Sequence, residues 1–358
     1  MKLRCGVAGL GRGRMFVEWL NALPECEVVA VCDSNSKALD AFSGLKAYTD
    51  FEQFVWRSDL DIVAVITPGP DHAPQSLLAM EAGVHVISET PCVYSLEQAE
   101  AIVRTAKLTG RKYMLAEDYI WMGWTLFLQD LRDRGILGEL LFAESEYTHD
   151  CRGGMLYDSE GRYYPVSAWG SRPDLTPTWR ASDLPPLFYC SHTLGPLLHL
   201  MDDRCVSAVG MNTGAQVAPE VCPTDMESGL LKTAKGKVIR LTNGFCIAHP
   251  FSFYLGLYGT RGSVRMVNLG GDKMTRFYTD EEADKGWQPM ELPWEERPDG
   301  KHWMQVMLGE YVAAIINDTE PPLDPCRSMD VTVPGICAHL SAEQGGELVA
   351  VPDYREGR

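Results

Sequence analysis

The stretch Cys5–Arg14 constrains the fold of this chain more than any other. A short apolar segment leads into a glycine-rich turn, and the residues after it have the spacing of an amphipathic helix. Gly9 and Gly11 allow backbone angles that other residues avoid, and amides at such a helix start can bind a pyrophosphate. The pattern departs from G-x-G-x-x-G, since Arg14 stands third and Gly13 is the nearest small residue. An ordinary glycine turn is the alternative interpretation.

Alternating apolar strands and helical segments follow this turn through the first third of the chain. This alternation is typical of a parallel sheet wound by crossover helices, which binds ligands at the carboxyl ends of its strands. We therefore predict an α/β protein that begins with a doubly wound Rossmann domain over residues 1–120. Its later strands are expected at 28–32, 61–66, 85–88 and 112–116, and its helices include 74–82 and 95–109.

Asp33 ends the second strand, about 20 residues after the glycine turn. A carboxylate at this position accepts hydrogen bonds from the adenosine ribose hydroxyls and repels a ribose phosphate, which favours NAD over NADP. Lys37, close by, keeps NADP open as the less favoured cofactor. The alternative interpretation is that Asp33 caps a helix that starts near Ser36.

Length, charge and cysteine usage narrow the class of protein. A chain of 358 residues exceeds what one hydrophobic core usually serves, so we expect two domains. The net charge of −17 argues against nonspecific binding to nucleic acid or anionic membranes. The eleven cysteines show no C-x-x-C spacing, which favours a reducing compartment. We also find no signal-peptide pattern before the first strand and no long apolar run. The cytoplasm is therefore the expected location.

Residues 121–358 are expected to form a second domain. A helix over 119–134 and an alternating strand over 138–147 lead into it, and turn residues then separate segments typical of antiparallel strands. These strands are predicted at 213–234, 238–248, 251–258 and 264–269, followed by helices at 303–317 and 328–343.

Residues 151–188 are rich in Gly, Pro, Tyr, Trp and Arg and show almost no periodicity. A loop this long is usually functional, so we interpret it as a lid or wall over a substrate. A structural excursion or a subunit contact is the alternative, because aromatic residues are common in both settings. The candidates for stacking on a sugar are Tyr163, Tyr164, Trp169 and Trp179.

A series of short motifs in the first domain resembles the Gfo/Idh/MocA family of NAD(P)-dependent sugar oxidoreductases. The series is Gly9-Leu10-Gly11, Asp33, Thr67-Pro68 with His72, Ala82–Val86 and Glu89-Thr90-Pro91. The resemblance implies a Rossmann domain followed by an α/β domain with a large open, mainly antiparallel sheet. That sheet often forms the dimer interface in the family, and the C-terminal helices can pack back on the Rossmann domain. It also implies cofactor contacts from Gly9, Gly11, Arg12, Gly13, Asp33, Thr67, Pro68, His72, Glu89, Thr90 and Pro91.

Thr90 departs from the family pattern. Typical dehydrogenases of the family have Glu-Lys-Pro where this chain has Glu89-Thr90-Pro91, and their lysine assists proton transfer at the oxidised hydroxyl. A threonine cannot replace a titrating amine. Ordinary sugar-dehydrogenase chemistry is therefore less expected here.

Motifs in the second half resemble the NAD-dependent retaining glycosidases within this family, typified by exo-acting α-N-acetylgalactosaminidases, which also lack that lysine. The motifs are Glu117, Tyr147-Thr148-His149-Asp150 and Tyr189-Cys190-Ser191-His192 with Gly195-Pro196. The resemblance implies Glu117, Tyr147, Tyr189 and His192 as catalytic candidates. Weaker substrate candidates are His149, Trp179, Arg180 and Tyr254, and Tyr258 is the alternative to Tyr254.

The chemistry of those glycosidases requires grouped acids and bases. A sugar hydroxyl is oxidised to a ketone, the neighbouring C–H becomes acidic, the aglycone leaves by elimination, water adds and the hydride returns. His192 or Tyr189 would remove the hydroxyl proton, and Tyr147 or Glu117 would serve the carbon-bound proton or the leaving oxygen. Alternatively, Glu117 would hold a substrate hydroxyl or the nicotinamide ribose. Glu89 would either bind the nicotinamide ribose or only orient the turn at Pro91.

Three functions remain open on the sequence alone. The preferred one is redox-assisted glycosidic cleavage, and the second is stoichiometric oxidation of a sugar or cyclitol or reduction of a keto-sugar. The third is an inactive NAD-binding sugar sensor. In the structural alternatives Tyr147 faces the core and His192 only caps or packs a helix. A metal site formed by His149, His192 and Glu117 is a further alternative, but no close H-x-E spacing supports it, so we expect no metal.

Overall fold

The computed structural model describes residues 2–355, whose contacts divide them into two units. Unit 1 contains residues 2–121, 296–330 and 354–355, and unit 2 contains residues 122–295 and 331–353. The division into domains of residues 1–120 and 121–358 stays a prediction.

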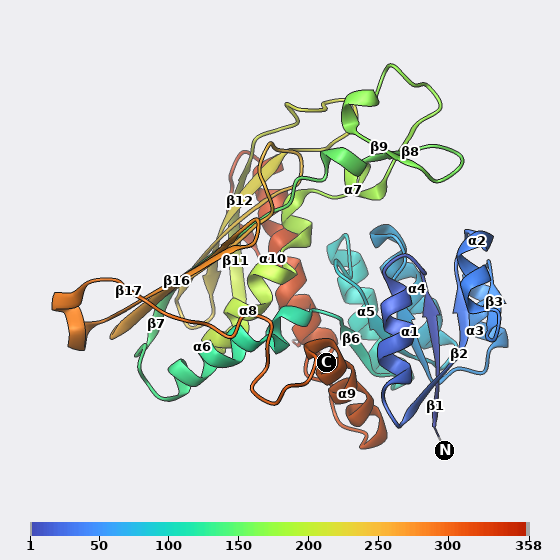
Figure 1. The fold of residues 1–358 in the computed structure, drawn as a ribbon, viewed down its shortest axis with the longest axis horizontal. Helices are drawn as coiled ribbons and strands as arrows, with labels where there is room; N and C mark the ends of the chain where they lie inside the picture. The colour runs from blue at the N-terminus through green and yellow to red at the C-terminus, as the bar shows by residue number, and fades with distance from the viewer. Residues whose placement is uncertain (1, 356–358) are drawn as a thin grey trace. The chain divides into compact units, whose positions relative to one another are not determined.

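The described residues of unit 1 form a six-stranded sheet in the order β3-β2-β1-β4-β5-β6 (Figure 1). All of its strand pairs are parallel, and β1 lies between β2 and β4, where the strand order reverses. This confirms the predicted Rossmann sheet. The strands are β1 Leu3–Ala8, β2 Cys26–Cys32, β3 Lys46–Tyr48, β4 Ile62–Val65, β5 His85–Ser88 and β6 Tyr113–Leu115.

The helices of unit 1 follow the predicted crossovers with small shifts at their ends. The Ser95 hydroxyl accepts a hydrogen bond from the Gln98 amide at 3.2 Å, and Gly110 ends that helix in the left-handed conformation, so the helix predicted at 95–109 is confirmed. The helices are α1 Gly13–Asn21, α2 Ser36–Leu39, α3 Phe51–Arg57, α4 His72–Glu81, α5 Leu96–Thr109 and α9 Trp303–Ile316, with the short 3-10 turns η1 Asp40–Phe42, η2 Gly69–Asp71 and η3 Asp118–Trp121.

The described residues of unit 2 form a nine-stranded mixed sheet in the order β17-β16-β15-β14-β7-β13-β12-β11-β18. The pair β7 and β13 is parallel, and the other pairs are antiparallel, as expected for a mainly antiparallel sheet. Its strands are β7 Leu140–Thr148, β11 Cys205–Asn212, β12 Met226–Thr233, β13 Val238–Gly244, β14 Ser252–Gly259, β15 Gly262–Leu269, β16 Asp272–Thr279, β17 Gln288–Pro289 and β18 Val349–Ala350.

The strand predicted over 213–234 is wrong in its first half. The chain pairs instead as Cys205–Asn212 with Met226–Thr233, and a loop joins them. The Asp225 carboxylate accepts hydrogen bonds from the amides of Gln216 and Val217 at 2.7 and 3.2 Å. These local bonds close the loop on itself, so it does not join the sheet.

Helices and short elements complete unit 2. The helix predicted at 119–134 is divided, since the turn η3 ends at Trp121 and α6 begins at Gly123. The segment 151–188 contains a small sheet in the order β10-β8-β9. The elements are α6 Gly123–Asp133, α7 Trp179–Ser182, α8 Ser191–Met201, α10 Pro325–Glu343, β8 Leu156–Tyr157, β9 Tyr163–Tyr164, β10 Thr176–Pro177, η4 Arg152–Gly154, η5 Val166–Ala168, η6 Pro186–Tyr189 and η7 Asp280–Lys285, with the first residues of α10 counted in unit 1.

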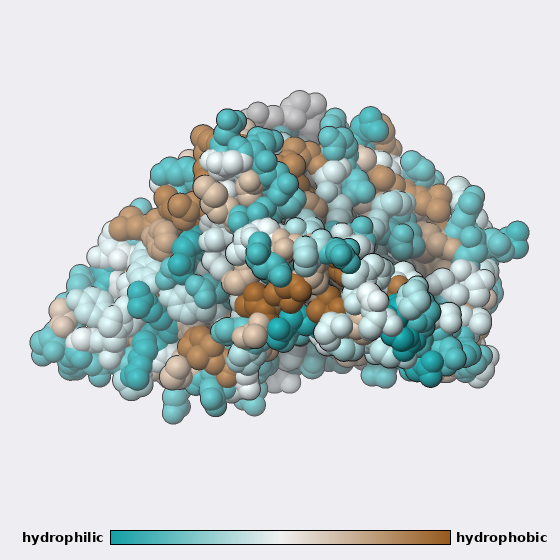
Figure 2. Space-filling view, turned by 90° about the horizontal axis from the view of Figure 1, so that it is seen from above, coloured by the Kyte–Doolittle hydropathy of each residue, from teal (hydrophilic) through white to brown (hydrophobic). Residues whose placement is uncertain are grey.

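The surface carries hydrophobic side chains interspersed among hydrophilic ones on the face shown in Figure 2. Large exposed hydrophobic residues include Trp56, Leu108 and Met211. Within residues 2–355, no helix combines the length and the apolar character that crossing a membrane requires.

Candidate functional site

The glycine turn of unit 1 requires glycine at Gly9. Its φ is +86°, and a Cβ built there would lie 2.3 Å from the carbonyl oxygen of Ile66. A Cβ on Gly13 would lie 3.0 Å from the Val7 side chain, which explains why the helix can approach the sheet so closely. The turn therefore packs directly against the start of the loop that follows β4.

Gly11 is different because a Cβ built there would meet no atom within 4 Å. The missing side chain leaves the backbone of the turn open to an approaching group. Helix α1 also begins without a side-chain cap and without an acidic residue in its first turn. Both features fit the pyrophosphate of a dinucleotide, which binds helix-start amides.

Asp33 lies beside this turn at the end of β2. Its Oδ2 accepts a hydrogen bond from the Leu10 amide at 2.7 Å, and its Oδ1 accepts one from the Asn35 amide at 2.8 Å. The side chain that caps α2 is that of Asn35, which accepts from the Lys37 amide. Asp33 therefore connects β2 to the glycine turn and is not the cap of that helix.

The Glu89-Thr90-Pro91 motif follows β5 in unit 1. Glu89 is 8% exposed and forms an ion pair with Arg12 of the glycine turn. The Thr90 hydroxyl is buried and has no hydrogen-bond partner within residues 2–355. An enclosed threonine at this position cannot take over the proton-transfer role of an exposed lysine amine.

His72 ties two loops of unit 1 together. Its Nδ1 lies 2.8 Å from the carbonyl oxygen of Pro91, and its Nε2 lies 2.7 Å from that of Thr67. The ring is 1% exposed, so these contacts hold the loops after β4 and β5. Thr67 itself donates its hydroxyl proton to Gln75. That His72, Thr67 and Pro68 contact a cofactor stays a prediction.

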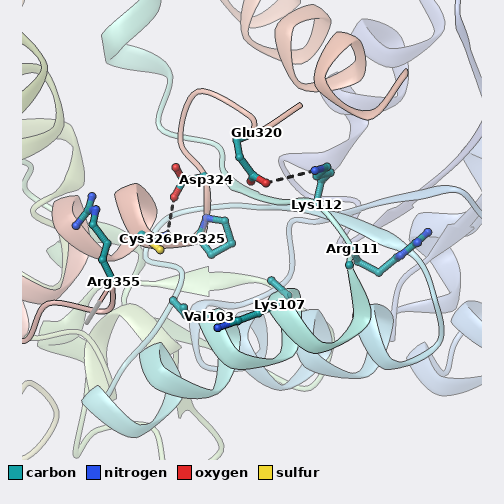
Figure 3. Close-up of a pocket in the computed structure, with 11 residues that line it drawn as sticks. Val103, Lys107, Arg111, Lys112, Glu320, Asp324, Pro325, Cys326 and Arg355 are labelled. Atoms are coloured by element: carbon teal, nitrogen blue, oxygen red, sulfur yellow. Dashed lines mark hydrogen bonds and ion pairs between the residues drawn. The ribbon is translucent and has the colours of Figure 1, made fainter. Parts of the chain in front are cut away.

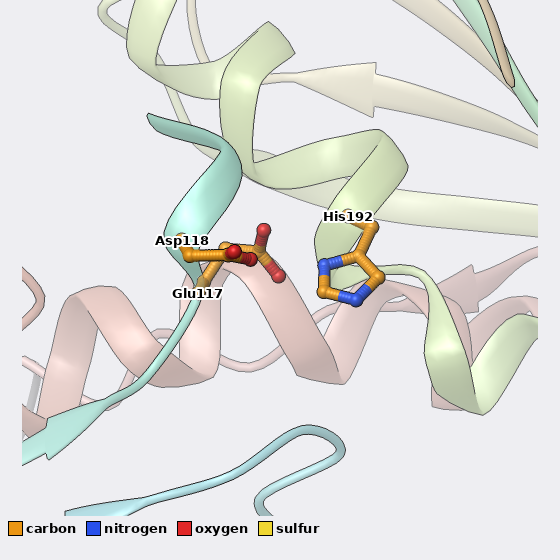
Figure 4. A group of neighbouring side chains, drawn as sticks. All are labelled: Glu117, Asp118 and His192. Atoms are coloured by element: carbon orange, nitrogen blue, oxygen red, sulfur yellow. The ribbon is translucent and has the colours of Figure 1, made fainter. Parts of the chain in front are cut away.

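Glu117 and Asp118 stand directly after β6, and His192 lies in the first turn of α8 (Figure 4). Glu117 is fully buried, and its Oε1 accepts a hydrogen bond from the Tyr119 amide at 3.2 Å. Trp303 donates its indole proton to Asp118 Oδ2 at 2.9 Å. Both carboxylates are thus oriented by residues of unit 1 itself.

Unit 2 brings three of the predicted catalytic residues together. The ring centres of Tyr189 and His192 are 5.0 Å apart in an edge-to-face arrangement. The Tyr147 ring lies 5.7 Å from that of His192 and 6.0 Å from that of Tyr189. Tyr147 and His192 are both 7% exposed. Two phenols and one imidazole therefore form a single cluster where β7 meets η6 and α8.

His149 lies at the rim of this cluster, 6.3 Å from the Tyr147 ring. Removal of water around the ring and the nearby positive charge of Arg180 lower the pKa of His149. Arg180 is exposed and its guanidinium covers the ring of Trp179 at 4.3 Å. Two substrate candidates thus act on each other electrostatically.

Phe245 and Phe251 complete the cluster and were not predicted from the sequence. Phe245 contacts both tyrosine rings at 6.2 and 5.7 Å, and Phe251 lies 5.6 Å from the ring of Tyr147. Phe245 follows β13 and Phe251 precedes β14, at the strand ends that pair with Thr148, so only the strand register identifies them. They give the tyrosine and histidine rings an apolar lining.

Tyr254 is not part of this cluster. Strand β14 pairs Phe253 with Tyr147, so Tyr254 points to the opposite face of the sheet. There its hydroxyl donates to Glu144 at 2.6 Å, and Tyr258 donates to the same carboxylate. Burial raises the pKa of Glu144, but these two hydroxyls and the charge of Arg240 outweigh it and leave the pKa lowered.

The remaining aromatic candidates lie in the segment 151–188. The Tyr164 hydroxyl donates to the buried Asp158 at 3.0 Å, and Trp169 donates to Glu220 at 3.1 Å. Tyr163 is 70% exposed. Their predicted role as stacking platforms, and that of the segment as a lid, stays a prediction.

A pocket of about 490 Å³ lies within unit 1, between α5 and the turn before α10 (Figure 3). Its charged lining includes Lys107, Lys112, Glu320, Asp324 and Arg355. Lys112 pairs with Glu320, and Asp324 accepts from the Cys326 amide. None of the residues predicted as functional from the sequence lines it.

We compared the chain with protein families, with curated proteins and with solved structures. Residues 3–117 match the model of the Gfo/Idh/MocA oxidoreductase family, NAD-binding Rossmann fold. A glycosyl hydrolase family 109 protein of Streptomyces niveus is 28% identical, over 99% of this chain and 78% of its own length.

Two solved structures share the fold at 18% identity and cover 98% of this chain. One is an oxidoreductase domain protein from Kribbella flavida, covered completely, with a TM-score of 0.77. The other is the WlbA dehydrogenase from Bordetella pertussis, solved with NADH and UDP-GlcNAcA, with a TM-score of 0.74 and 99% of its chain covered. Residues 3–117 are therefore similar to the NAD-binding Rossmann domain of the Gfo/Idh/MocA oxidoreductase family.

Proposed function

We propose that this protein is an NAD-dependent enzyme that cleaves a glycosidic bond through a transient sugar ketone. The observation that carries the proposal is the cluster of Tyr147, Tyr189 and His192, which gathers three proton-transferring groups in one apolar setting. The relatives named glycosyl hydrolase family 109, which align with nearly the whole chain, support it. Thr90 in place of a lysine favours it over simple dehydrogenation.

The cofactor is assigned to the glycine turn of unit 1. Bound NAD would supply a hydride acceptor that is restored at the end of each cycle. Gly11 leaves the turn open and Gly9 shapes it, while Arg12 and Glu89 hold the adjoining loop by their ion pair. Asp33 stands where a ribose phosphate would meet a carboxylate, so NAD is preferred over NADP.

The proton transfers are assigned to the cluster in unit 2. An imidazole accepts and returns protons near neutral pH, which suits His192 as the base for the sugar hydroxyl, and the phenol of Tyr189 is the alternative. Tyr147 then serves the carbon-bound proton or the leaving oxygen, with Glu117 as the alternative. His149 and Arg180 supply polar groups for the sugar at the rim.

A panel of aryl glycosides tests the proposal in the presence of substoichiometric NAD. We expect release of the phenol without net change in nicotinamide absorbance, because hydride is taken and returned. In heavy water the product should carry deuterium beside the oxidised carbon. Phenol release without deuterium would contradict elimination, and accumulation of NADH would favour a stoichiometric dehydrogenase.

Cofactor choice has a separate test. Replacing Asp33 by Ser removes the carboxylate. The dissociation constant for NADP divided by that for NAD should then fall by about tenfold, or about 1.4 kcal/mol. Titration of both dinucleotides against the wild type and the variant measures this ratio. An unchanged ratio would show that Asp33 does not select the cofactor. The cytoplasmic location and the homodimer or higher oligomer expected from the sequence stay predictions.

A further inference from the structure

A row of three paired residues crosses the sheet of unit 2 below η6. Asn243 on β13 pairs with Tyr147 on β7 and with Glu227 on β12. Residues paired directly on neighbouring strands share one face of a sheet, so all three side chains lie on the face that carries the Tyr147 cluster. Asn243 is fully buried and Glu227 is 2% exposed. The sheet thus places two buried polar side chains beside a catalytic candidate.

Asn243 holds both ends of η6. Its Nδ2 donates to the carbonyl oxygens of Pro186 at 3.1 Å and of Tyr189 at 3.2 Å. Both protons of one amide group are therefore used on a single turn of backbone. The second carbonyl belongs to Tyr189 itself, three residues before His192.

Glu227 holds the middle of the same turn. Its Oε2 accepts a hydrogen bond from the Leu187 amide at 2.8 Å, and its Oε1 lies 2.6 Å from Nδ1 of His339 on α10. A buried carboxylate is costly unless it is paired, and this one has both a backbone donor and an imidazole. The side chain of Phe188 packs edge-to-face on the same imidazole at 5.1 Å.

Helix α10 also packs directly against η6. A Cβ on Gly335 would lie 2.0 Å from the carbonyl oxygen of Leu187, so the helix approaches this turn at a distance that only glycine permits. The Cys190 thiol donates to the carbonyl oxygen of Val331 at 3.4 Å. The turn is therefore held both by the polar row and by the helix.

We propose that Asn243 and Glu227 are positioning residues that set the place of Tyr189 and His192 relative to Tyr147. This proposal rests on the proposed function, because it assigns the row to the same proton-transferring cluster. Three hydrogen bonds to backbone atoms of a four-residue turn fix its location along the sheet, which apolar packing alone does not. Loss of such placement by about 1 Å is enough to lower turnover about 10²-fold.

Variants at Asn243 test the proposal against a control on the same strand. Asn243→Ala removes both donors, and Asn243→Ser keeps one. Thr242→Val is the matched control, because Thr242 points to the other face. Within residues 2–355 its side-chain hydroxyl hydrogen-bonds only to the Ser228 hydroxyl, at 3.0 Å. Glu227→Ala and its conservative partner Glu227→Gln form a second pair, since glutamine retains an acceptor for Leu187.

Two readouts are measured on each full-length variant. Hydrogen–deuterium exchange of the peptide that contains residues 187–192 reports on the turn without any substrate. The kcat and KM values for the aryl glycoside that the wild type cleaves best report on catalysis. We expect faster exchange and about a 10²-fold lower kcat in Asn243→Ala, with KM within about twofold. Asn243→Ser should lie between it and the wild type, Glu227→Gln should restore what Glu227→Ala loses, and Thr242→Val should match the wild type.

The outcomes separate the two proposals. Exchange that is no faster than in Thr242→Val overturns the positioning proposal, and so does faster exchange with an unchanged kcat. If Asn243→Ala does not fold, Asn243→Ser and the Glu227 pair carry the same test. If the wild type cleaves no glycoside, the proposed function fails, and the exchange rates still decide whether the row holds the turn.

Discussion

The carboxylate of Glu227 and the imidazole of His339 meet at 2.6 Å inside unit 2, although their residues are more than a hundred positions apart in the chain. Burial lowers the pKa of His339, but the hydrogen bond and the negative charge of Glu227 outweigh it, with a further contribution from Glu343. The pKa of His339 is therefore raised above its ordinary value of 6.5. This pair connects strand β12 to helix α10.

The raised pKa makes the stability of the fold depend on pH. A group whose pKa is higher in the folded state stabilises the fold fully below its unfolded pKa, and this contribution disappears as pH rises through the folded pKa. We expect the free energy of unfolding of wild type minus that of His339→Gln to be largest below pH 6.5 and to shrink above it. Urea denaturation of both proteins from about pH 5 to about pH 9 measures the difference, which would stay constant if the pair did not titrate.

Alanine substitutions at Gly9 and Gly11 should affect different properties: the first should lower stability, and the second should weaken NAD binding. Gly9→Ala should destabilise the protein by about 1–3 kcal/mol, because its positive φ and the Ile66 carbonyl oppose a Cβ. Gly11→Ala should unfold at nearly the wild-type temperature but bind NAD at least about tenfold more weakly, because its methyl group points into open space. Thermal melts and NAD titrations test both, and tight NAD binding by Gly11→Ala would exclude this turn as the pyrophosphate site.

Helix α10 offers a second glycine contrast. Gly335→Ala should cost about 1–3 kcal/mol of stability, since its Cβ would lie 2.0 Å from the Leu187 oxygen and 2.5 Å from the Cys190 sulfur. Gly309→Ala is the control within α9, where the nearest atom is 3.8 Å away, and should stabilise by about 0.5–1 kcal/mol. Guanidinium denaturation of the two variants gives both values, and equal effects would contradict the close packing of η6.

Two histidines on helix α8 separate catalysis from structure. His192→Ala should lower kcat by about 10²–10⁴-fold, the range expected for loss of a general acid or base. His199→Ala removes an imidazole from the same helix, where it contacts Gln129 at 2.9 Å, and should retain turnover. Steady-state rates on an aryl glycoside, together with near-UV circular dichroism, make the comparison. Equal losses in both variants would assign His192 a structural role.

Local signals in the sequence predict most of unit 1. The Ser95 cap, the glycine turn and the apolar strands act over a few residues, so their pattern is visible without tertiary information. The strand predicted to begin at residue 213 was wrong, because the Asp225 carboxylate closes a loop there by hydrogen bonds. The hydrophobic periodicity of the sequence does not reveal such bonds. A short-range pattern therefore predicts caps, turns and apolar strands, and it misses a loop that a side chain eight or nine residues away closes by hydrogen bonds.

The site residues divide in the same way. Tyr147, Tyr189 and His192 were found through motifs, and the structure brings their rings together. Tyr254 falls on the other face, because the pairing of Phe253 with Tyr147 fixes the register and a strand alternates its side chains. Asn243 and Glu227 carry no motif, and only the pairing of three strands across the sheet reveals them.

The parallel pairing of β7 with β13 also sets an order of assembly. On β7, Tyr147 meets its neighbour Asn243 only after about a hundred further residues have been made, whereas β1, β2 and β4 of unit 1 come from the first 65 residues. During synthesis β1, β2 and β4 can therefore pair well before β13 is available to pair with β7 beneath the tyrosine and histidine cluster. A nascent chain would form the strands beside the glycine turn early and the cluster of Tyr147, Tyr189 and His192 late.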